Sequence, residues 1–557
     1  MKTNISTKIF ILFCFNLIGP NPIFSQTYNS YNDLAKEASD KKNYNLTIEY
    51  CNKSLALQNN GWAYWTKANA EFMLYKNKEA AEDYGNAIKY YTDNSSKSKL
   101  YFYRGDCYYN LFSYKNAIDD YSKANTYGFS DYGLLYKSRG DSYKWNGDYT
   151  KAIEDYNKAL SYFASTPKKH SEIYQSKGYC NNLNKNYEDA INDYSKAIDI
   201  DPGNYTAYES RAYVYAKKLF YQKAKDDLTK AIELNTDTLF GKYDKGVMLK
   251  NRALYNYYLG NYEDGINDCE KANKTDSSTR TYWNLAMNLS GLKQFSKSNE
   301  AYIKERELNK DSTNKALLSR NISLNLIDLL NYKSALDEIN KAILFNDKYA
   351  AGFLTRARIK KVQKNYLSAI DDYDKSLQLK IADISTIYKE KGEIYYILKD
   401  QDQALYNYKK YLELLPNNST ALYEYGRFLI ESKKDIIDGK EKLKQCVALT
   451  LSNDTSSNYS FAKVFLGEKD EAINNLFRLI DKYKNDKDSY QWQLHVMACI
   501  YALSGNAKKA IEYQEKSFKA GYDDFEHLLT DRDFASIQYL PEYKALLKKY
   551  KMPIPKY

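Results

Sequence analysis

The stretch NYEDAINDYSKAIDIDPGN at residues 186–204 decides the fold, because close variants of it return along the chain. SYKNAIDDYSKANTYG occupies residues 113–128, and DYTKAIEDYNKAL occupies residues 148–160. From Ala190 the apolar stripe continues at Tyr194, Ala197 and Ile198, which is the spacing of an amphipathic helix. Repetition of one amphipathic helix predicts an array of similar helical units.

The position of Ala190 can be followed through fourteen copies. The mean spacing is about 36 residues, which is typical of helical repeats, and its variation from 33 to 41 indicates insertions in loops. The equivalent positions are Thr47, Ala80, Ala117, Ala152, Ala190, Ala224, Gly265, Ser298, Ala335, Ala369, Ala404, Gly439, Ala472 and Ala510.

A second helix is predicted before the marker in each copy. Twelve residues upstream a small residue recurs, which predicts a close crossing of two helices. These residues are Ala68, Gly105, Gly140, Gly178, Ala212, Ala253, Ala286, Ala357, Gly392 and Ala498. Four residues before the marker, nine copies carry a residue whose side chain can cap a helix start. They are Asn43, Ser113, Asp148, Asn186, Asn261, Asn331, Asn365, Asp400 and Asn506.

Together these signals resemble the tetratricopeptide repeat (TPR) over about residues 28–520. The resemblance rests on three features. A small residue precedes the pattern Ala-x-x-x-Tyr-x-x-Ala by twelve positions, and Pro202 or Pro416 closes a copy. The resemblance implies an all-α fold, a right-handed α-solenoid of about 14 helix-turn-helix repeats. The closing proline is a departure, since only two copies have it.

Four segments are expected along the chain. Residues 1–25 read as a signal peptide, and residues 26–450 as repeats 1–12. Repeats 13 and 14 occupy residues 451–520, after the polar linker SNDTSSN at 452–458, which is a candidate hinge. Residues 521–557 resemble the terminal segment of bacterial TPR arrays, and they are expected to cover the apolar face of the last repeat.

The N-terminal segment predicts export. Lys2 and Lys8 precede the apolar run IFILFCFNLI at residues 9–18, and Ser25 offers a small residue for cleavage. The run is too short to span a bilayer, which takes about 20 residues; an uncleaved anchor is the alternative. No later segment predicts a membrane span, so the mature chain is expected in the periplasm, at the cell surface or in the medium.

Composition and motifs argue against nucleic-acid binding and catalysis. The net charge of +11 is interleaved with acidic residues instead of forming a concentrated basic face. Only three histidines occur, at His170, His495 and His527, in different copies or outside them, and we expect none to meet. Acidic pairs such as Asp119-Asp120 and Asp371-Asp372 are interpreted as a solvated face. No cofactor, metal site or enzymatic activity is therefore predicted.

Six cysteines follow the predicted signal peptide, each in a different copy: Cys51, Cys107, Cys180, Cys269, Cys446 and Cys499. An even number in an exported protein favours disulfides. However, neighbouring copies lie a helix pair apart, beyond disulfide reach for most pairs. We expect all six to be reduced, acting as small apolar core residues.

The predicted function is that of a scaffold or adaptor that binds a protein or peptide. In the TPR family the first helix of each repeat lines a concave groove, and aromatic residues dominate binding hot spots. By position the groove would hold Trp62, Trp65, Phe102, Tyr109, Tyr179, Tyr213, Tyr257, Trp283 and Tyr396. Packing between repeats is the alternative role for each.

Other functions stay open at this stage. Surface glycan binding is the main alternative, since tryptophan and tyrosine also stack on sugars; an RNA-binding helical repeat and an unrecognised enzyme are the others. Some TPR proteins hold a partner's C-terminal carboxylate through Lys and Asn on the first helix. Here those slots read Lys137/Asp141, Lys250/Leu254 and Lys389/Glu393, so that mode is not expected.

Overall fold

A computed structural model describes residues 27–235, 241–275, 281–451, 457–524, 527–528 and 531–550. Every regular element in these ranges is a helix, which confirms the predicted all-α class of tandem helical repeats. The predicted signal peptide and residues 452–456 of the predicted hinge lie outside them. Within the described part of the chain, no helix combines the length and apolar character needed to cross a bilayer.

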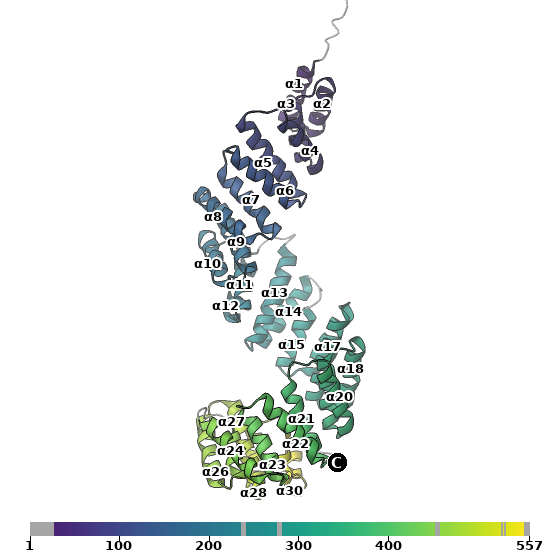
Figure 1. The fold of residues 1–557 in the computed structure, drawn as a ribbon, viewed down its shortest axis with the longest axis vertical. Coiled ribbons are helices and arrows are strands. Elements are labelled where there is room, and N and C mark those ends of the chain that lie inside the picture. The colour runs from purple at the N-terminus through teal and green to yellow at the C-terminus, as the bar shows by residue number, and fades with distance from the viewer. Residues whose placement is uncertain are drawn as a thin grey trace, which may run out of the picture. The chain divides into compact units, whose positions relative to one another are not determined.

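The chain divides into two compact units, residues 1–248 and 249–557. Figure 1 shows their helices following one another along the chain in pairs. The first unit contains α1 (Tyr28–Asp40), α2 (Tyr44–Leu57), α3 (Gly61–Met73), α4 (Asn77–Ile88), α5 (Asn94–Asn110), α6 (Tyr114–Thr126), α7 (Tyr132–Asn146), α8 (Tyr149–Phe163), α9 (Pro167–Leu183), α10 (Tyr187–Ile200), α11 (Tyr205–Lys217) and α12 (Tyr221–Leu234). Helix α13 (Gly241–Tyr258) crosses the boundary between the units.

The second unit continues the same pairing. It contains α14 (Tyr262–Thr275), α15 (Thr281–Gly291), α16 (Phe295–Leu308), α17 (Ser312–Asp328), α18 (Tyr332–Phe345), α19 (Ala350–Val362), α20 (Tyr366–Gln378), α21 (Ile384–Ile397), α22 (Gln401–Leu414), α23 (Ser419–Glu431), α24 (Ile436–Leu451), α25 (Asn458–Phe465), α26 (Lys469–Lys482), α27 (Lys487–Leu503), α28 (Ala507–Ala520), the 3₁₀ turn η1 (Arg532–Phe534) and α30 (Pro541–Lys549).

Within each unit, the odd-numbered helices form one layer and the even-numbered helices another. An odd helix typically packs on the even helix that follows it, as α5 on α6 and α7 on α8. In the first unit, α5, α7, α9 and α11 also contact one another in sequence. Since elements on the inside of a curved stack lie closer together, these first helices form the inner face of the unit.

The core follows the predicted stripe. The marker alanines, among them Ala152 and Ala190, are fully buried, and so are Tyr156 and Tyr194 four residues later. These tyrosines explain the upstream glycines: a Cβ on Gly178 would lie 2.9 Å from the Tyr194 ring. The small residue of the first helix is thus needed to admit a tyrosine ring as well as to let two backbones cross.

The predicted helix caps are only partly correct. Side chains of Asn43, Asn331, Asp400 and Asn506 accept a hydrogen bond from the helix start, as expected. Those of Ser113, Asp148, Asn186 and Asn365 do not. The main-chain hydrogen bond that closes the turn is present in both groups, as where Asp148 N donates to Tyr143 O at 2.9 Å and Asn43 N donates to Ala38 O at 2.8 Å.

The prediction that acidic pairs form a solvated face is wrong for one member of each pair. Asp120 is 2% exposed and Asp372 is 4% exposed, whereas Asp119 and Asp371 face solvent. Each buried aspartate is paired with a basic residue sixteen positions earlier, on the preceding helix. Seven such pairs recur in the described residues: Lys67–Asp83, Arg104–Asp120, Arg139–Asp155, Lys177–Asp193, Arg211–Asp227, Arg252–Asp268 and Arg356–Asp372.

The cysteines agree with their prediction. All six described cysteines are buried and unbridged, each within a helix of a different pair. Burial raises the pKa of Cys51, Cys107, Cys180, Cys269 and Cys446 to about 12, so these thiols stay protonated at neutral pH. They fill core positions as small apolar side chains.

Candidate interaction surface

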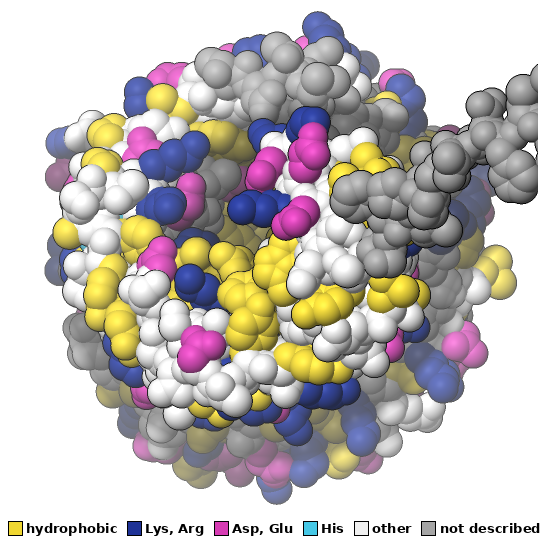
Figure 2. Space-filling model, turned by 90° about the horizontal axis from the view of Figure 1, so that it is seen from above, with side chains coloured by type: hydrophobic (Ala, Val, Ile, Leu, Met, Phe, Trp, Pro, Cys, Tyr) yellow, Lys and Arg dark blue, Asp and Glu magenta, His cyan; other side chains and the backbone are white. Residues whose placement is uncertain are grey.

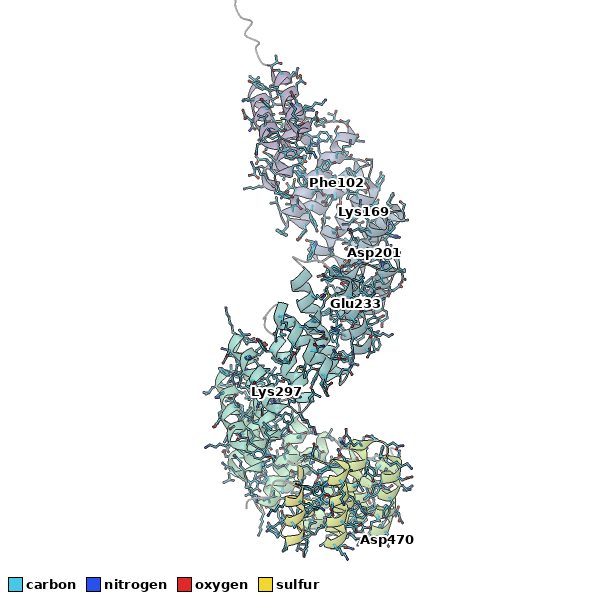
Figure 3. The ribbon with its side chains drawn as sticks, turned by 180° about the vertical axis from the view of Figure 1, so that it is seen from behind. Phe102, Lys169, Asp201, Glu233, Lys297 and Asp470 are labelled. Atoms are coloured by element: carbon cyan, nitrogen blue, oxygen red, sulfur yellow. The ribbon has the colours of Figure 1, made fainter. Side chains whose placement is uncertain are left out.

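The nine predicted groove residues do not form one surface. Phe102, labelled in Figure 3, is 2% exposed and stacks on Phe129 with ring centroids 4.2 Å apart, so its prediction as a groove residue is wrong. The physical reason is that Phe102 lies on the side of α5 that faces the following repeat. Tyr179 and Tyr213 are exposed. The other six predicted groove residues are half-buried: Trp62, Trp65, Tyr109, Tyr257, Trp283 and Tyr396.

Two of the half-buried residues take part in packing between helices. Trp65 meets Tyr91 edge to face, with ring centroids 5.3 Å apart, and borders the core cluster around Ala68 and Tyr84. Trp283 packs against the core of α15 to α17, and its Nε1 donates to Met287 Sδ at 3.1 Å. Trp65 and Trp283 therefore have the alternative role named above, packing between helices.

Four aromatic residues on α5, α7, α9 and α11 form what we call the aromatic row: Tyr109, Trp145, Tyr179 and Tyr213. The side chains of Trp145, Tyr179 and Tyr213 are 52%, 39% and 51% exposed. The rings of Trp145 and Tyr179 lie 6.5 Å apart, although they come from different repeats. Because these helices form the inner face, the row runs across four consecutive repeats.

Trp145 is absent from the predicted groove residues. It follows Gly140 by five positions, whereas Tyr179 and Tyr213 follow their small residue by one. Residues one and five positions on lie about 40° apart around a helix, hence on the same face. Counting that fifth position as groove-facing would have found Trp145 in the sequence.

Charged side chains border the aromatic row. Asp141 binds Lys137 at 2.9 Å and Lys144 at 3.1 Å, and the Tyr156 hydroxyl donates to it at 2.7 Å. Although burial raises the pKa of Asp141, the two lysines bring it below its ordinary value, so the carboxylate is ionised at neutral pH. The Lys144 ammonium lies 5.3 Å from the Trp145 ring centroid. The row thus combines aromatic area with fixed charges of both signs.

In the second unit the chain's own C-terminal segment lies on first helices. The Arg532 guanidinium is 5.7 Å from the ring of Tyr396 on α21 and binds Glu424 on α23 at 2.6 Å. Asp533 binds Arg427, also on α23, at 2.6 Å. Tyr396, predicted to face a partner, therefore contacts a residue from the same chain.

The same terminal segment covers the last helix pair. Tyr522, Phe534, Ile537 and Tyr543 join one buried cluster with residues of α27 and α28. Next to the predicted hinge, Cys446 of α24 and Ala462 of α25 share another core cluster.

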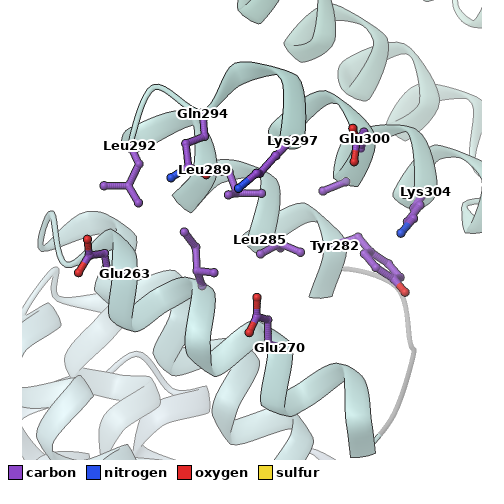
Figure 4. Close-up of a pocket in the computed structure, with 12 residues that line it drawn as sticks. Glu263, Glu270, Tyr282, Leu285, Leu289, Leu292, Gln294, Lys297, Glu300 and Lys304 are labelled. Carbon is purple, nitrogen blue, oxygen red and sulfur yellow. The ribbon is translucent and has the colours of Figure 1, made fainter.

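A cavity of about 410 Å³ lies between α14, α15 and α16, and sequence reasoning did not foresee it. Its lining is apolar at Ile266, Leu285 and Leu289. Figure 4 shows acidic residues of α14 facing Lys297 and Lys304 of α16 across it. Two of its three helices, α14 and α16, are second helices of their repeats, so the cavity is not lined by first helices alone.

The expectation that no two histidines meet is wrong. The rings of His495 on α27 and His527 lie 5.3 Å apart, and both imidazoles approach Asp531. The separation of 32 residues hid this contact, because the terminal segment folds back onto α27. His170, on α9, stands apart beside Tyr174.

Family models match the chain at two places. A tetratricopeptide repeat model covers residues 135–165, and a TPR repeat model covers residues 183–218. The chain contains tetratricopeptide repeats.

Individual relatives are distant. A TPR repeat-containing protein of Methanocaldococcus jannaschii is 24% identical over 201 residues, and that match spans 34% of each protein. The C-terminal part of a TPR repeat-containing protein from Cytophaga hutchinsonii is similar in structure, at 20% identity and a TM-score of 0.39, over 47% of this chain and 99% of that one. A tetratricopeptide repeat protein from Parabacteroides merdae reaches 18% identity and a TM-score of 0.36, over 46% and 98%.

In this TPR array, two of the three lysines at the slots of a carboxylate clamp have acidic partners of their own. Lys137 is bound to Asp141, as described above. Lys389 lies 3.8 Å from Glu393 and 3.7 Å from Glu424. A partner's carboxylate would have to displace these ion pairs, so the geometry favours a different binding mode.

Proposed function

We propose that this TPR protein is a non-catalytic scaffold that binds a protein or peptide segment along the inner face of its first unit. The aromatic row is the observation that carries the proposal. Exposed tyrosine and tryptophan side chains supply large contact area at low cost in conformational entropy, and such residues dominate interface hot spots. The row places three of them on neighbouring first helices.

The second unit supplies an internal precedent for the binding mode. There a polypeptide segment, residues 531–534, already lies on first helices, with an arginine over Tyr396 and ion pairs to Glu424 and Arg427. We infer that a partner binds the first unit through related chemistry: apolar contact along the edges of the aromatic side chains, flanked by charge-assisted hydrogen bonds to the charged groups beside them.

The alternative of glycan binding is less well supported. Stacking on a sugar needs an open ring face. Lys144 lies over Trp145, and the Lys217 ammonium lies 4.7 Å from the Tyr213 ring centroid, so a cation already lies against each ring. On the face in Figure 2, basic and acidic side chains are interspersed, which agrees with the proposal that the partner is not a nucleic acid.

Selection of a peptide-display library on the purified chain would test the proposal. The double variant Trp145→Ala and Tyr179→Ala is expected to lose binding of the selected peptides by tenfold or more, as about 1–2 kcal/mol per hot-spot residue requires. The matched control is Tyr75→Ala with Phe112→Ala. These two aromatics are 87% and 78% exposed in turns of the same unit, and the control should leave affinity unchanged.

Equal affinity of both double variants for the selected peptides would reject the aromatic row as the site. Binding to a glycan array that is lost in the same Trp145 and Tyr179 variant would instead support the sugar-binding alternative. Circular dichroism of each variant shows whether the helical fold is retained.

We also propose that the protein is exported through its N-terminal segment. The basic start and short apolar run at residues 1–25 support this. Fusion of residues 1–30 to a reporter that is active only outside the cytoplasm tests it, with Lys2 and the apolar run replaced in the control. An inactive reporter in the unmodified fusion would contradict export.

A further inference from the structure

Three side chains from the last helix pair and the terminal segment converge at one point. The Nε2 atoms of His495 and His527 lie 3.3 Å and 3.7 Å from Oδ2 of Asp531. All three atoms lie within 4.8 Å of one another. Cys499, one turn after His495 on α27, places its Sγ 3.6 Å from His495 Nε2 and 3.4 Å from Asp531 Oδ2.

The surrounding residues orient these groups toward the common point. The Nδ1 atom of His495 lies 2.8 Å from Oε1 of the buried Gln514, and this contact leaves the Nε2 atom on the side of Asp531. Oδ1 of Asp531 accepts the main-chain N–H of Asp533 at 2.8 Å, and its Oδ2 is left facing the imidazoles. Such partners of the non-coordinating atoms are characteristic of metal-binding histidines and carboxylates.

This arrangement places Nε2 of His495 3.3 Å from a carboxylate oxygen in a nearly dry environment, since the side chains of His495 and Asp531 are 1% and 6% exposed. A buried carboxylate needs a positive partner, which either a proton on the imidazole or a metal ion supplies. A metal ion bound to both atoms would neutralise the carboxylate while the Gln514 contact keeps the ring in place.

Four of the six spacings between the donor atoms are close to those of a tetrahedral ion. With bonds of about 2.0 Å to nitrogen or oxygen and about 2.3 Å to sulfur, the edges of a tetrahedral zinc site are about 3.3–3.6 Å long. The four separations given above, 3.3, 3.7, 3.6 and 3.4 Å, fall close to that range. A four-coordinate site also requires Cys499 Sγ to approach His527, because these two residues do not share a group of donor atoms within 4.8 Å of one another. Imidazole, carboxylate and thiolate together are the donor set of zinc rather than of magnesium or calcium, which prefer oxygen.

We propose that His495, His527 and Asp531 bind a divalent transition metal of the zinc class, with Cys499 as the fourth donor. On binding, the Cys499 thiol gives up its proton to solvent and coordinates as thiolate. His527, whose side chain is 40% exposed, provides the route by which the ion enters. This proposal differs from the expectation from sequence that the chain holds no metal.

The position of the site gives the metal a structural role. It joins α27, through His495, to the terminal segment, through His527 and Asp531. The neighbouring residues Arg532 and Asp533 are those that bind Glu424 and Arg427 on α23. A bound ion would therefore hold the terminal segment on α23, a first helix of the second unit.

The test uses the full chain, purified with a tag that contains no histidine, stripped with a chelator and titrated with Zn²⁺. One ion per chain should remain after desalting, as measured by elemental analysis. His527→Asn and Asp531→Asn should each weaken zinc binding by tenfold or more. His170→Asn is the matched control, since His170 lies on α9 in the other unit, and it should bind as the unmodified chain does.

Cobalt(II) distinguishes the ligands. The unmodified chain should show the ligand-field bands of tetrahedral cobalt and a sulfur-to-metal charge-transfer band, and Cys499→Ser should lose only the latter. Absence of the charge-transfer band in the unmodified chain would overturn Cys499 as a ligand. Failure of the folded unmodified chain to retain zinc, or equal affinity in His527→Asn, would overturn the site. His527→Asn is the decisive variant because its half-exposed side chain contributes least to the core.

Discussion

Arg104 on α5 and Asp120 on α6 share two hydrogen bonds, Nε to Oδ2 at 2.6 Å and Nη2 to Oδ1 at 2.8 Å. Asp120 is 2% exposed, whereas its neighbour Asp119 faces solvent. The same bidentate pair recurs in later repeats, for example between Arg139 and Asp155. It therefore links the two helices of a repeat at a fixed height, in addition to the tyrosine and alanine core.

Asp120→Asn is expected to lower the free energy of unfolding by about 3 kcal/mol, because it leaves the arginine in a largely buried site without its counter-charge. Asp119→Asn, one residue away on the solvent side, should change it by less than about 0.5 kcal/mol. Urea titrations followed by circular dichroism measure both. Similar midpoints for the two variants would show that the buried pair has no special role in stability.

The raised pKa of Asp106 predicts that the stability of the fold depends on pH. Burial raises its pKa to about 6, although the Tyr121 hydroxyl, which donates to Oδ1 at 2.6 Å, acts in the opposite direction. An unfolded aspartate has a pKa of about 3.9. Between about pH 4 and pH 6 the folded chain therefore holds more protons than the unfolded chain, and stability falls as the pH rises through this window.

Asp106→Asn removes this titration while an amide oxygen can still accept from Tyr121. The free energy of unfolding of the variant, relative to that of the unmodified chain, is expected to rise by about 2 kcal/mol from pH 4 to pH 7. This value allows for the partial solvent exposure of Asp106. The difference between the two chains in urea midpoint, measured at each pH, isolates this group. A difference that does not change with pH would contradict the assignment.

Tyr543 and Tyr539 offer a matched pair for the terminal segment. Tyr543 is 2% exposed and its ring centroid lies 5.5 Å from that of Phe534, whereas Tyr539 is 58% exposed. Tyr543→Ala should destabilise the second unit by about 3 kcal/mol, since it empties part of the core that covers α27 and α28. Tyr539→Ala should have an effect below about 1 kcal/mol. Limited proteolysis of the terminal segment reports the difference, and equal cleavage rates would refute it.

Gly426 and Gly439 face each other where α23 crosses α24. A Cβ on Gly426 would lie 2.8 Å from the carbonyl oxygen of Gly439, and a backbone atom cannot move aside as a flexible side chain can. Gly426→Ala is expected to destabilise the second unit by about 1–3 kcal/mol through overpacking.

Gly85→Ala is the control with the opposite expected sign. Its Cβ would approach only the end of the Arg104 side chain, at 3.2 Å, and alanine has the higher helix propensity. A gain of up to about 1 kcal/mol is expected in thermal or urea unfolding. A loss in both variants would indicate that glycine is required in these helices for a reason other than close contact.

Much of the fold could be predicted from local pattern. The marker spacing, the small residue twelve positions earlier and the buried tyrosine four positions later all reflect contacts within one helix pair. Ala190 and Tyr194 are buried as expected. Such contacts repeat with the sequence period, so one chain displays them many times over.

The candidate sites were less predictable, since they join residues of different repeats or of no repeat. Phe102 was assigned to the groove from its place on a first helix, but it contacts Phe129 beyond the second. Trp145 was missed, although a count of positions around the helix would have placed it beside Tyr179.

The sequence by itself determined the all-α class, the tandem repetition and much of the composition of the repeat cores, because helix periodicity and burial are local properties. Only the tertiary structure decided which of two adjacent aspartates is buried against an arginine. It alone brought His495, His527 and Asp531 together and laid Arg532 against Tyr396. The reason is that the terminal segment has no period: where it folds back depends on the surface that the preceding helices present, and that surface exists only once they have packed.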